Sequence, residues 1–167
     1  MDRKLIDQFE VSLNQIVGLK CWGVIAGSGT GSVIDIQLGD RIRRRKPLKN
    51  PTLTDEQQKF ESAFALFIEC VWRLDSESRV ICGAWDDNSE GGVMITGLRQ
   101  LVGCTVSSID ILRPSLDLSV SFLGCNGKLN LKVFCDSVNS IDADDNYSLA
   151  TPSGHYVIGN RSALRIE

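Results

Sequence analysis

The sequence predicts a β-rich α+β domain in which two related halves, each a helix followed by an antiparallel meander, pack together. Three observations support this prediction. Apolar residues alternate along several segments, one long segment has helical spacing, and short motifs recur in the same order about 85 residues apart. An all-β domain with one or two helices is the alternative that these observations leave open.

The size of the chain fits one large domain or two very small ones. It has 167 residues, of which 43% are hydrophobic and 23% are charged. A folded chain of this length buries roughly 70% of the surface that it exposes when unfolded, which is enough for a core. We therefore predict a single domain over 1–167, with halves at about 1–90 and 91–167 and a basic insertion at 40–58.

The segment 5–17 is predicted to be an amphipathic helix that ends at Gly18, a common C-terminal stop. Its apolar residues recur at helical spacing and are Leu5, Ile6, Phe9, Leu13, Ile16 and Val17. Inside the insertion, Thr54 and Gln57 fit a capping box and predict the start of a second, short helix.

Strands are predicted where apolar residues alternate. In the first half they lie at 22–26, 32–38, 66–74 and 79–85. The glycine-rich segment 27–31 joins the first two. The alternation is unbroken over 66–74, so this segment is predicted to be one strand whose hairpin partner is 79–85.

The second half repeats this plan. The segment 98–103 matches 13–18 at an offset of 85, with Leu, Gln, Val and Gly identical. Four further matches follow in the same order, pairing 118–122 with 34–38, 129–135 with the segment from 66, 147–149 with 72–74 and 157–159 with 80–83. Asn126 and Gly127 predict a two-residue hairpin turn between two of these strands.

Charge is unevenly distributed, although the net charge is only -3. The basic residues gather in one predicted loop and include Arg41, Arg43, Arg44, Arg45 and Lys46. The acidic residues gather in two clusters, one formed by Asp86, Asp87 and Glu90 beside Trp85, and one by Asp142, Asp144 and Asp145. Because the pI is near 5.2, we interpret the basic run as a solvated or partner-facing loop and not as a nucleic-acid footprint.

Motifs for catalysis, metals and cofactors are missing from the sequence. There is one histidine, His155, no C-x-x-C pair and no G-x-S-x-G elbow. The glycine-rich turn leads into a strand, and the acidic run from Asp142 lacks the glycine and glutamate of a calcium loop. We therefore expect no catalytic residue, no metal and no cofactor, although a pair between His155 and a cysteine stays open.

The N-terminus lacks the apolar region of a secretory signal, and the longest apolar stretch, 63–68, is too short to span a membrane. A cytoplasmic protein is the expectation. The cysteines are widely spaced and are interpreted as small buried hydrophobes in a reducing compartment. They are Cys21, Cys70, Cys82, Cys104, Cys125 and Cys135.

Several motifs carry a resemblance to a known group of proteins. They are Trp22-Gly23, 29–32, 70–74, 116–122 and 145–149. With these motifs in this order, the chain resembles small bacterial proteins of unknown function, some of which are similar to immunity proteins of toxin systems. The resemblance implies a bacterial, cytoplasmic and non-enzymatic protein, and it transfers no site residues.

The favoured hypothesis is a non-enzymatic module that binds another protein and blocks its active site, as immunity proteins do. Its contact residues would be Trp85 and the two acidic clusters, which could replace phosphates in the basic cleft of a nuclease. Two alternatives stay open. One is a ligand-binding protein or small enzyme with a cleft between the halves, and the other is a subunit of a larger complex. Self-association is also left open.

Overall fold

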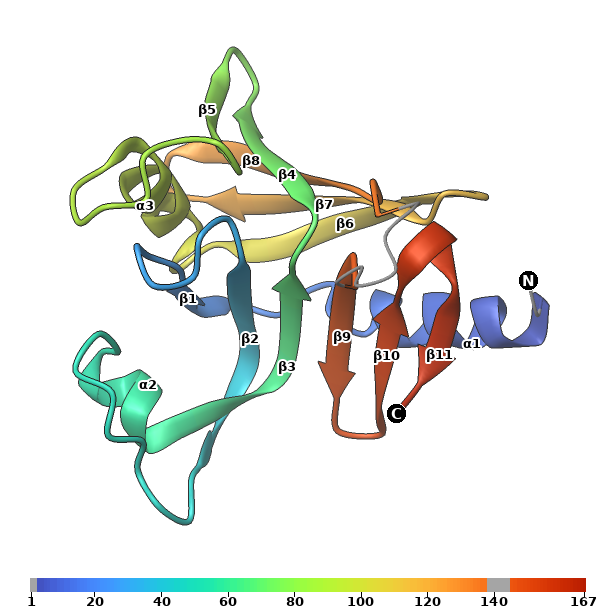
Figure 1. Ribbon diagram of the computed structural model, residues 1–167, viewed down its shortest axis with the longest axis horizontal. Helices are drawn as coiled ribbons and strands as arrows, with labels where there is room; N and C mark the ends of the chain where they lie inside the picture. The colour runs from blue at the N-terminus through green and yellow to red at the C-terminus, as the bar shows by residue number, and fades with distance from the viewer. Residues whose placement is uncertain (1–2, 138–144) are drawn as a thin grey trace.

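The computed structural model describes residues 3–137 and 145–167, which form two antiparallel sheets facing each other (Figure 1). One sheet has the strand order β1 (Cys21–Ile25), β2 (Ile34–Arg43), β3 (Phe60–Ile68), β9 (Tyr147–Thr151), β10 (Gly154–Ile158) and β11 (Leu164–Ile166). The other has the order β5 (Val80–Gly83), β4 (Val71–Ser76), β8 (Gly127–Phe134), β7 (Asp117–Gly124) and β6 (Thr105–Leu112). The predicted β-rich class with antiparallel sheets is confirmed.

Helices are short and lie at the margins of the sheets. They are α1 (Arg3–Asn14), α2 (Asp55–Lys59) and α3 (Val93–Leu98), with 3-10 turns η1 (Arg99–Leu101) and η2 (Asn160–Ser162). In α1 the predicted apolar stripe is buried at Ile6, Phe9 and Leu13, and the Phe9 ring lies 5.6 Å from that of Tyr156. The helix ends three residues earlier than predicted, and Val17 is exposed.

The two sheets exchange strands between the halves of the chain. The meanders β1-β2-β3 and β6-β7-β8 lie in different sheets, but the strand that follows each meander crosses to the other sheet. Thus β4 pairs with β8, with Trp72 opposite Val133, and β9 pairs with β3, with Tyr147 opposite Ile68. Each sheet therefore needs strands from both halves.

This exchange corrects the prediction of one strand over 66–74. The chain leaves the six-stranded sheet after Ile68 and enters the five-stranded sheet at Val71. At the crossing, the backbone N–H groups of Glu69 and Cys70 both donate to the carbonyl oxygen of Asn146. The apolar alternation continues because both strands face the same core, so the sequence pattern does not reveal the change of sheet.

Backbone hydrogen bonds where the halves meet follow the offset of 85 residues. When 85 is added to the residue number of the donor and subtracted from that of the acceptor, the bond from Gly18 to Val106 becomes the bond from Gly103 to Cys21. In the same way, the bond from Cys21 to Cys104 becomes the bond from Val106 to Leu19. The four N–H to O distances are 2.8 Å for Gly18 to Val106, 2.8 Å for Gly103 to Cys21, 2.8 Å for Cys21 to Cys104 and 2.9 Å for Val106 to Leu19. Two halves related by a twofold axis would give this pattern.

The core lies between the sheets and contains the inward residues of both. Trp72 is its largest buried side chain, and the indole Nε1 donates to the Ser32 carbonyl at 2.7 Å. The predicted inward sets are buried, namely Ile34, Ile36 and Leu38 in β2 and Leu118, Val120 and Phe122 in β7.

Three details differ from the sequence prediction. The edge strand β6 was not predicted, although Ile109 and Ile111 alternate with the polar residues Ser108 and Asp110 within it. The β7–β8 turn consists of Cys125 and Asn126, one residue before the predicted pair, because Gly124 pairs with Gly127. Cys125 is exposed and not buried.

The other cysteines fit the prediction of small buried hydrophobes in most cases. Four are buried, Cys135 is half-buried, and none of the six takes part in a disulfide in the structure as described. Burial raises the pKa of the Cys21, Cys70 and Cys82 thiols to about 12, so these groups stay protonated at neutral pH.

Candidate functional site

The exposed aromatic residue Trp85 is presented on a well-ordered turn between β5 and α3. Its side chain is 85% exposed. On either side of it, the Gly83 N–H donates to Oδ2 of Asp86 at 2.8 Å, and the Ala84 N–H donates to the Trp72 carbonyl at 3.0 Å. We call residues 85–90 the Trp85 turn. The backbone is fixed while the indole is in solvent.

Hydrogen bonds also hold the acidic residues of the Trp85 turn. The Asp87 carboxylate accepts from the backbone and hydroxyl of Ser89 at 3.0 and 2.9 Å, and these bonds lower the pKa of Asp87. Asn88 donates to the carbonyls of Gly27 and Gly31 at 3.1 and 2.9 Å, which ties the turn to the glycine-rich loop after β1. The turn therefore presents Asp86, Asp87 and Glu90 as an exposed negative surface.

The second predicted acidic cluster does not join this turn. Asp145 forms two hydrogen bonds with the Arg165 guanidinium, at 2.8 and 2.7 Å, and Arg165 lowers the pKa of its carboxyl. Arg165 lies on β11, at the opposite end of the molecule from α3 in Figure 1. Asp142 and Asp144 fall outside the described residues.

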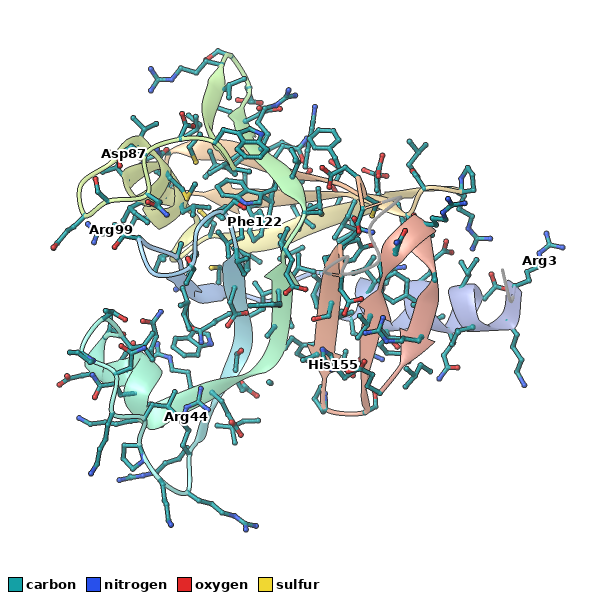
Figure 2. All side chains as sticks on the ribbon, in the orientation of Figure 1. Arg3, Arg44, Asp87, Arg99, Phe122 and His155 are labelled. Carbon is teal, nitrogen blue, oxygen red and sulfur yellow. The ribbon has the colours of Figure 1, made fainter. Side chains whose placement is uncertain are left out.

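The predicted basic loop is in part a strand. Arg41 and Arg43 belong to β2, because this strand continues past a bulge at Gly39 and pairs with the start of β3. Beyond β2 the chain runs through Arg45 and Lys46 into a protruding arm that ends in α2 (Figure 1; Arg44 is labelled in Figure 2).

Two arginines of this basic segment have partners within the chain. Arg41 pairs with Glu56 and lies 5.5 Å above the Trp22 ring, and Arg44 pairs with Glu61 at 3.0 Å. Within the described ranges, no ion pair involves the other three, which are Arg43, Arg45 and Lys46. Their charge is free to attract an acidic surface.

A cavity of about 540 Å³ lies between α2 and α3, and sequence reasoning missed it. We call it the α2–α3 cleft. Trp22 and Val24 of β1 line it together with Glu56 of α2, and Leu98 and Arg99 line it from the second half. Trp22 is half-buried. A local sequence pattern does not predict this cleft, because its lining residues come from three separate segments of the chain, 22–26, 52–57 and 95–102.

His155 lies at the surface of the six-stranded sheet. It is half-exposed on β10 (Figure 2), and its Nδ1 lies 3.7 Å from a carboxylate oxygen of Glu167. It lines neither the α2–α3 cleft nor the 570 Å³ cavity beside Cys104 and Arg79. Residues 3–137 and 145–167 contain no group of three His, Cys, Asp or Glu side chains that could hold a metal ion.

Comparison with known proteins leaves the resemblance noted in the sequence untested. No protein-family model matches the chain, and no curated protein or solved structure matches it. As for membranes, no helix in the described part of the chain has the length and apolar character needed to cross one.

Proposed function

We propose that this protein is a non-enzymatic binding module of the immunity or inhibitor type, which neutralises a toxin or nuclease by covering its active site. The observation that carries the proposal is Trp85, a large aromatic side chain in solvent on a backbone that hydrogen bonds hold in place. Tryptophan is enriched among residues that dominate protein–protein binding, and a rigid setting lowers the entropy lost on docking.

The charge around Trp85 supports a basic partner surface. Asp86, Asp87 and Glu90 extend from the same turn, and the hydrogen bonds from Ser89 lower the pKa of the Asp87 carboxyl. In a nuclease cleft, such carboxylates would occupy the positions of substrate phosphates. Complementary charge of this kind accelerates association and makes it sensitive to salt. Asp145 would add less, because Arg165 already neutralises it.

Immunity proteins are encoded beside their toxins, so the product of the adjacent gene is the partner to test. It would be expressed with and without this protein in a growth assay, and the affinity of the purified pair would be measured at about 50 and about 300 mM salt. We expect relief of growth arrest by the wild type and a loss of about 30-fold in affinity for Trp85→Ala. Glu90→Lys should lower the affinity and flatten its salt dependence.

The matched control is Leu112→Ala, which removes another exposed apolar side chain, 63% exposed at the end of edge strand β6. This variant should bind like the wild type. Unchanged affinity for Trp85→Ala, or an equal loss in Leu112→Ala, would contradict the assignment of Trp85. A neighbouring gene product that neither binds nor affects growth would contradict the immunity role.

A further inference from the structure

The α2–α3 cleft contains one charge that its own surroundings leave unpaired. Among the residues that line it, the acidic ones are Asp55 and Glu56, and both have basic partners in the chain: Lys59 at 3.8 Å and Arg41, respectively. Arg99 is exposed on the opposite wall, and the described structure gives its side chain no ion pair or hydrogen bond. The positive charge of Arg99 is therefore the one that an anionic ligand in the cleft would neutralise.

Apolar side chains line the part of the cleft beside Trp22. Val24, Ile95, Leu98 and Val102 line it beside the Trp22 ring. The indole Nε1 of Trp22 is buried, and no acceptor within the described residues bonds to it. This donor stays unpaired within the described residues, at a cost of about 1–3 kcal/mol, and the ring contributes to the cleft as an apolar wall.

Hydrogen bonds hold the walls of the cleft in place before any ligand arrives. Thr54 and Gln57 form the predicted capping box at the start of α2. The Gln57 side chain then donates to the Val24 carbonyl at 3.2 Å and to the Gln37 side chain at 3.3 Å. Gly23 allows this approach, because a Cβ there would lie 2.4 Å from the Gln37 side-chain oxygen.

We propose that the α2–α3 cleft binds a small carboxylate that carries an apolar body. The carboxylate would sit on the Arg99 guanidinium, and the body would lie along Leu98 and Val102 toward the Trp22 ring. Figure 2 shows Arg99 below α3, on the side that faces α2. The volume of about 540 Å³ is in the range of small-molecule sites. This site uses no residue of the Trp85 turn, so it goes beyond the proposed function.

Octanoate is a suitable probe, and octanamide is its uncharged analogue. Both would be titrated into the ¹⁵N-labelled protein, with the three indole N–H signals as reporters. We expect saturable octanoate binding that moves the Trp22 signal and leaves those of Trp72 and Trp85 unchanged. Octanamide should bind about tenfold more weakly, because it cannot form the charge-assisted bond with Arg99.

Two variants separate the contributions of the site. Arg99→Gln should weaken octanoate binding about tenfold and leave octanamide binding unchanged. Trp22→Phe keeps the aromatic wall that the apolar body contacts, so it should leave octanoate binding close to that of the wild type. The matched control is Arg79→Gln, which changes an exposed arginine beside the other cavity and should have no effect.

Three results would overturn the proposal: equal affinity for octanoate and octanamide, equal losses in Arg99→Gln and Arg79→Gln, or no binding up to about 5 mM octanoate. Since Arg99 is exposed, the variant should fold normally, and the amide spectrum of the labelled sample reports this directly. Failure here leaves the role of Trp85 untouched. Likewise, if Trp85→Ala does not change partner affinity, the octanoate titration still tests the cleft independently.

Discussion

The carboxyl group of Asp35, a half-buried residue in β2, makes the stability of this protein depend on pH in an unusual direction. Asp35 points away from the core between its cross-strand neighbours, Ile25 of β1 and Phe67 of β3. Its Oδ1 atom is buried, and nothing in the described structure donates a hydrogen bond to it. Burial raises the pKa of this carboxyl from 3.8 to about 6.

The sign of the effect follows from where the proton binds. Between about pH 4 and pH 6 the native Asp35 carboxyl holds a proton that the unfolded chain has released, so the free energy of unfolding falls as pH rises. Raising the pKa from 3.8 to about 6 corresponds to about 3 kcal/mol, as an upper bound. This stabilisation is complete below pH 3.8 and lost above about pH 6.

The substitution Asp35→Asn keeps the shape of the side chain and removes its charge. We expect the variant to exceed the wild type in unfolding free energy at pH 7, by up to about 3 kcal/mol, and to approach it at about pH 4. Urea unfolding followed by tryptophan fluorescence across this range measures the difference. Asp40→Asn, at an exposed position of the same strand, is the control and should leave the pH profile unchanged.

Two results would refute this reasoning. One is a difference between wild type and Asp35→Asn that stays constant with pH, because the carboxyl would then titrate alike in the native and unfolded states. The other is a variant that is less stable than the wild type at pH 7. That result would mean that the ionised carboxylate is stabilised in the native protein by more than its burial costs.

Other predictions concern the backbone, the core and the Trp85 turn. Gly18→Ala and Gly103→Ala should each lower the free energy of unfolding in urea by about 1 kcal/mol, because φ is +87° and +91° and no described atom lies near the position of the added Cβ. Clearly unequal losses would contradict the equivalence of these two positions in the two halves. Trp72→Phe should cost about 2–4 kcal/mol in thermal unfolding, whereas Trp85→Phe should change stability by less than about 0.5 kcal/mol. Asn88→Ala should speed amide exchange in the Trp85 turn, and unchanged protection would show that its two bonds are dispensable.

The sequence predicted which side chains face the core better than it predicted which strands pair. Alternation identified the buried face of β2 and of β7 correctly. It failed at Glu69 and Cys70, where the chain changes sheets, because side-chain burial is the same on either side of the crossing. Hydrogen-bond partners depend on segments far away in the chain, and a local pattern does not encode them.

The candidate sites also differ in whether local sequence or contacts between distant segments determine them. Trp85 stood out because an aromatic residue precedes acids where a predicted strand ends, and its exposure follows from that local setting. The pairing of Asp145 with Arg165 depends on the antiparallel course of three strands, β9 to β11. The α2–α3 cleft depends on Trp22 and Leu98 lining the same cavity, which local periodicity does not report.

Strand exchange links both sites to the folding of the whole chain. The first half supplies β4 and β5 to the sheet of the second, and the second half supplies β9 to β11 to the sheet of the first. A half on its own would leave a three-stranded meander with an unpaired edge and an uncovered apolar face. The Trp85 turn follows β5 and is tied to the loop after β1, and the cleft has walls from both halves. Both surfaces therefore form only when the two halves fold together. A destabilising core substitution should thus weaken binding at the Trp85 turn and at the cleft, although the substituted residue contacts neither surface.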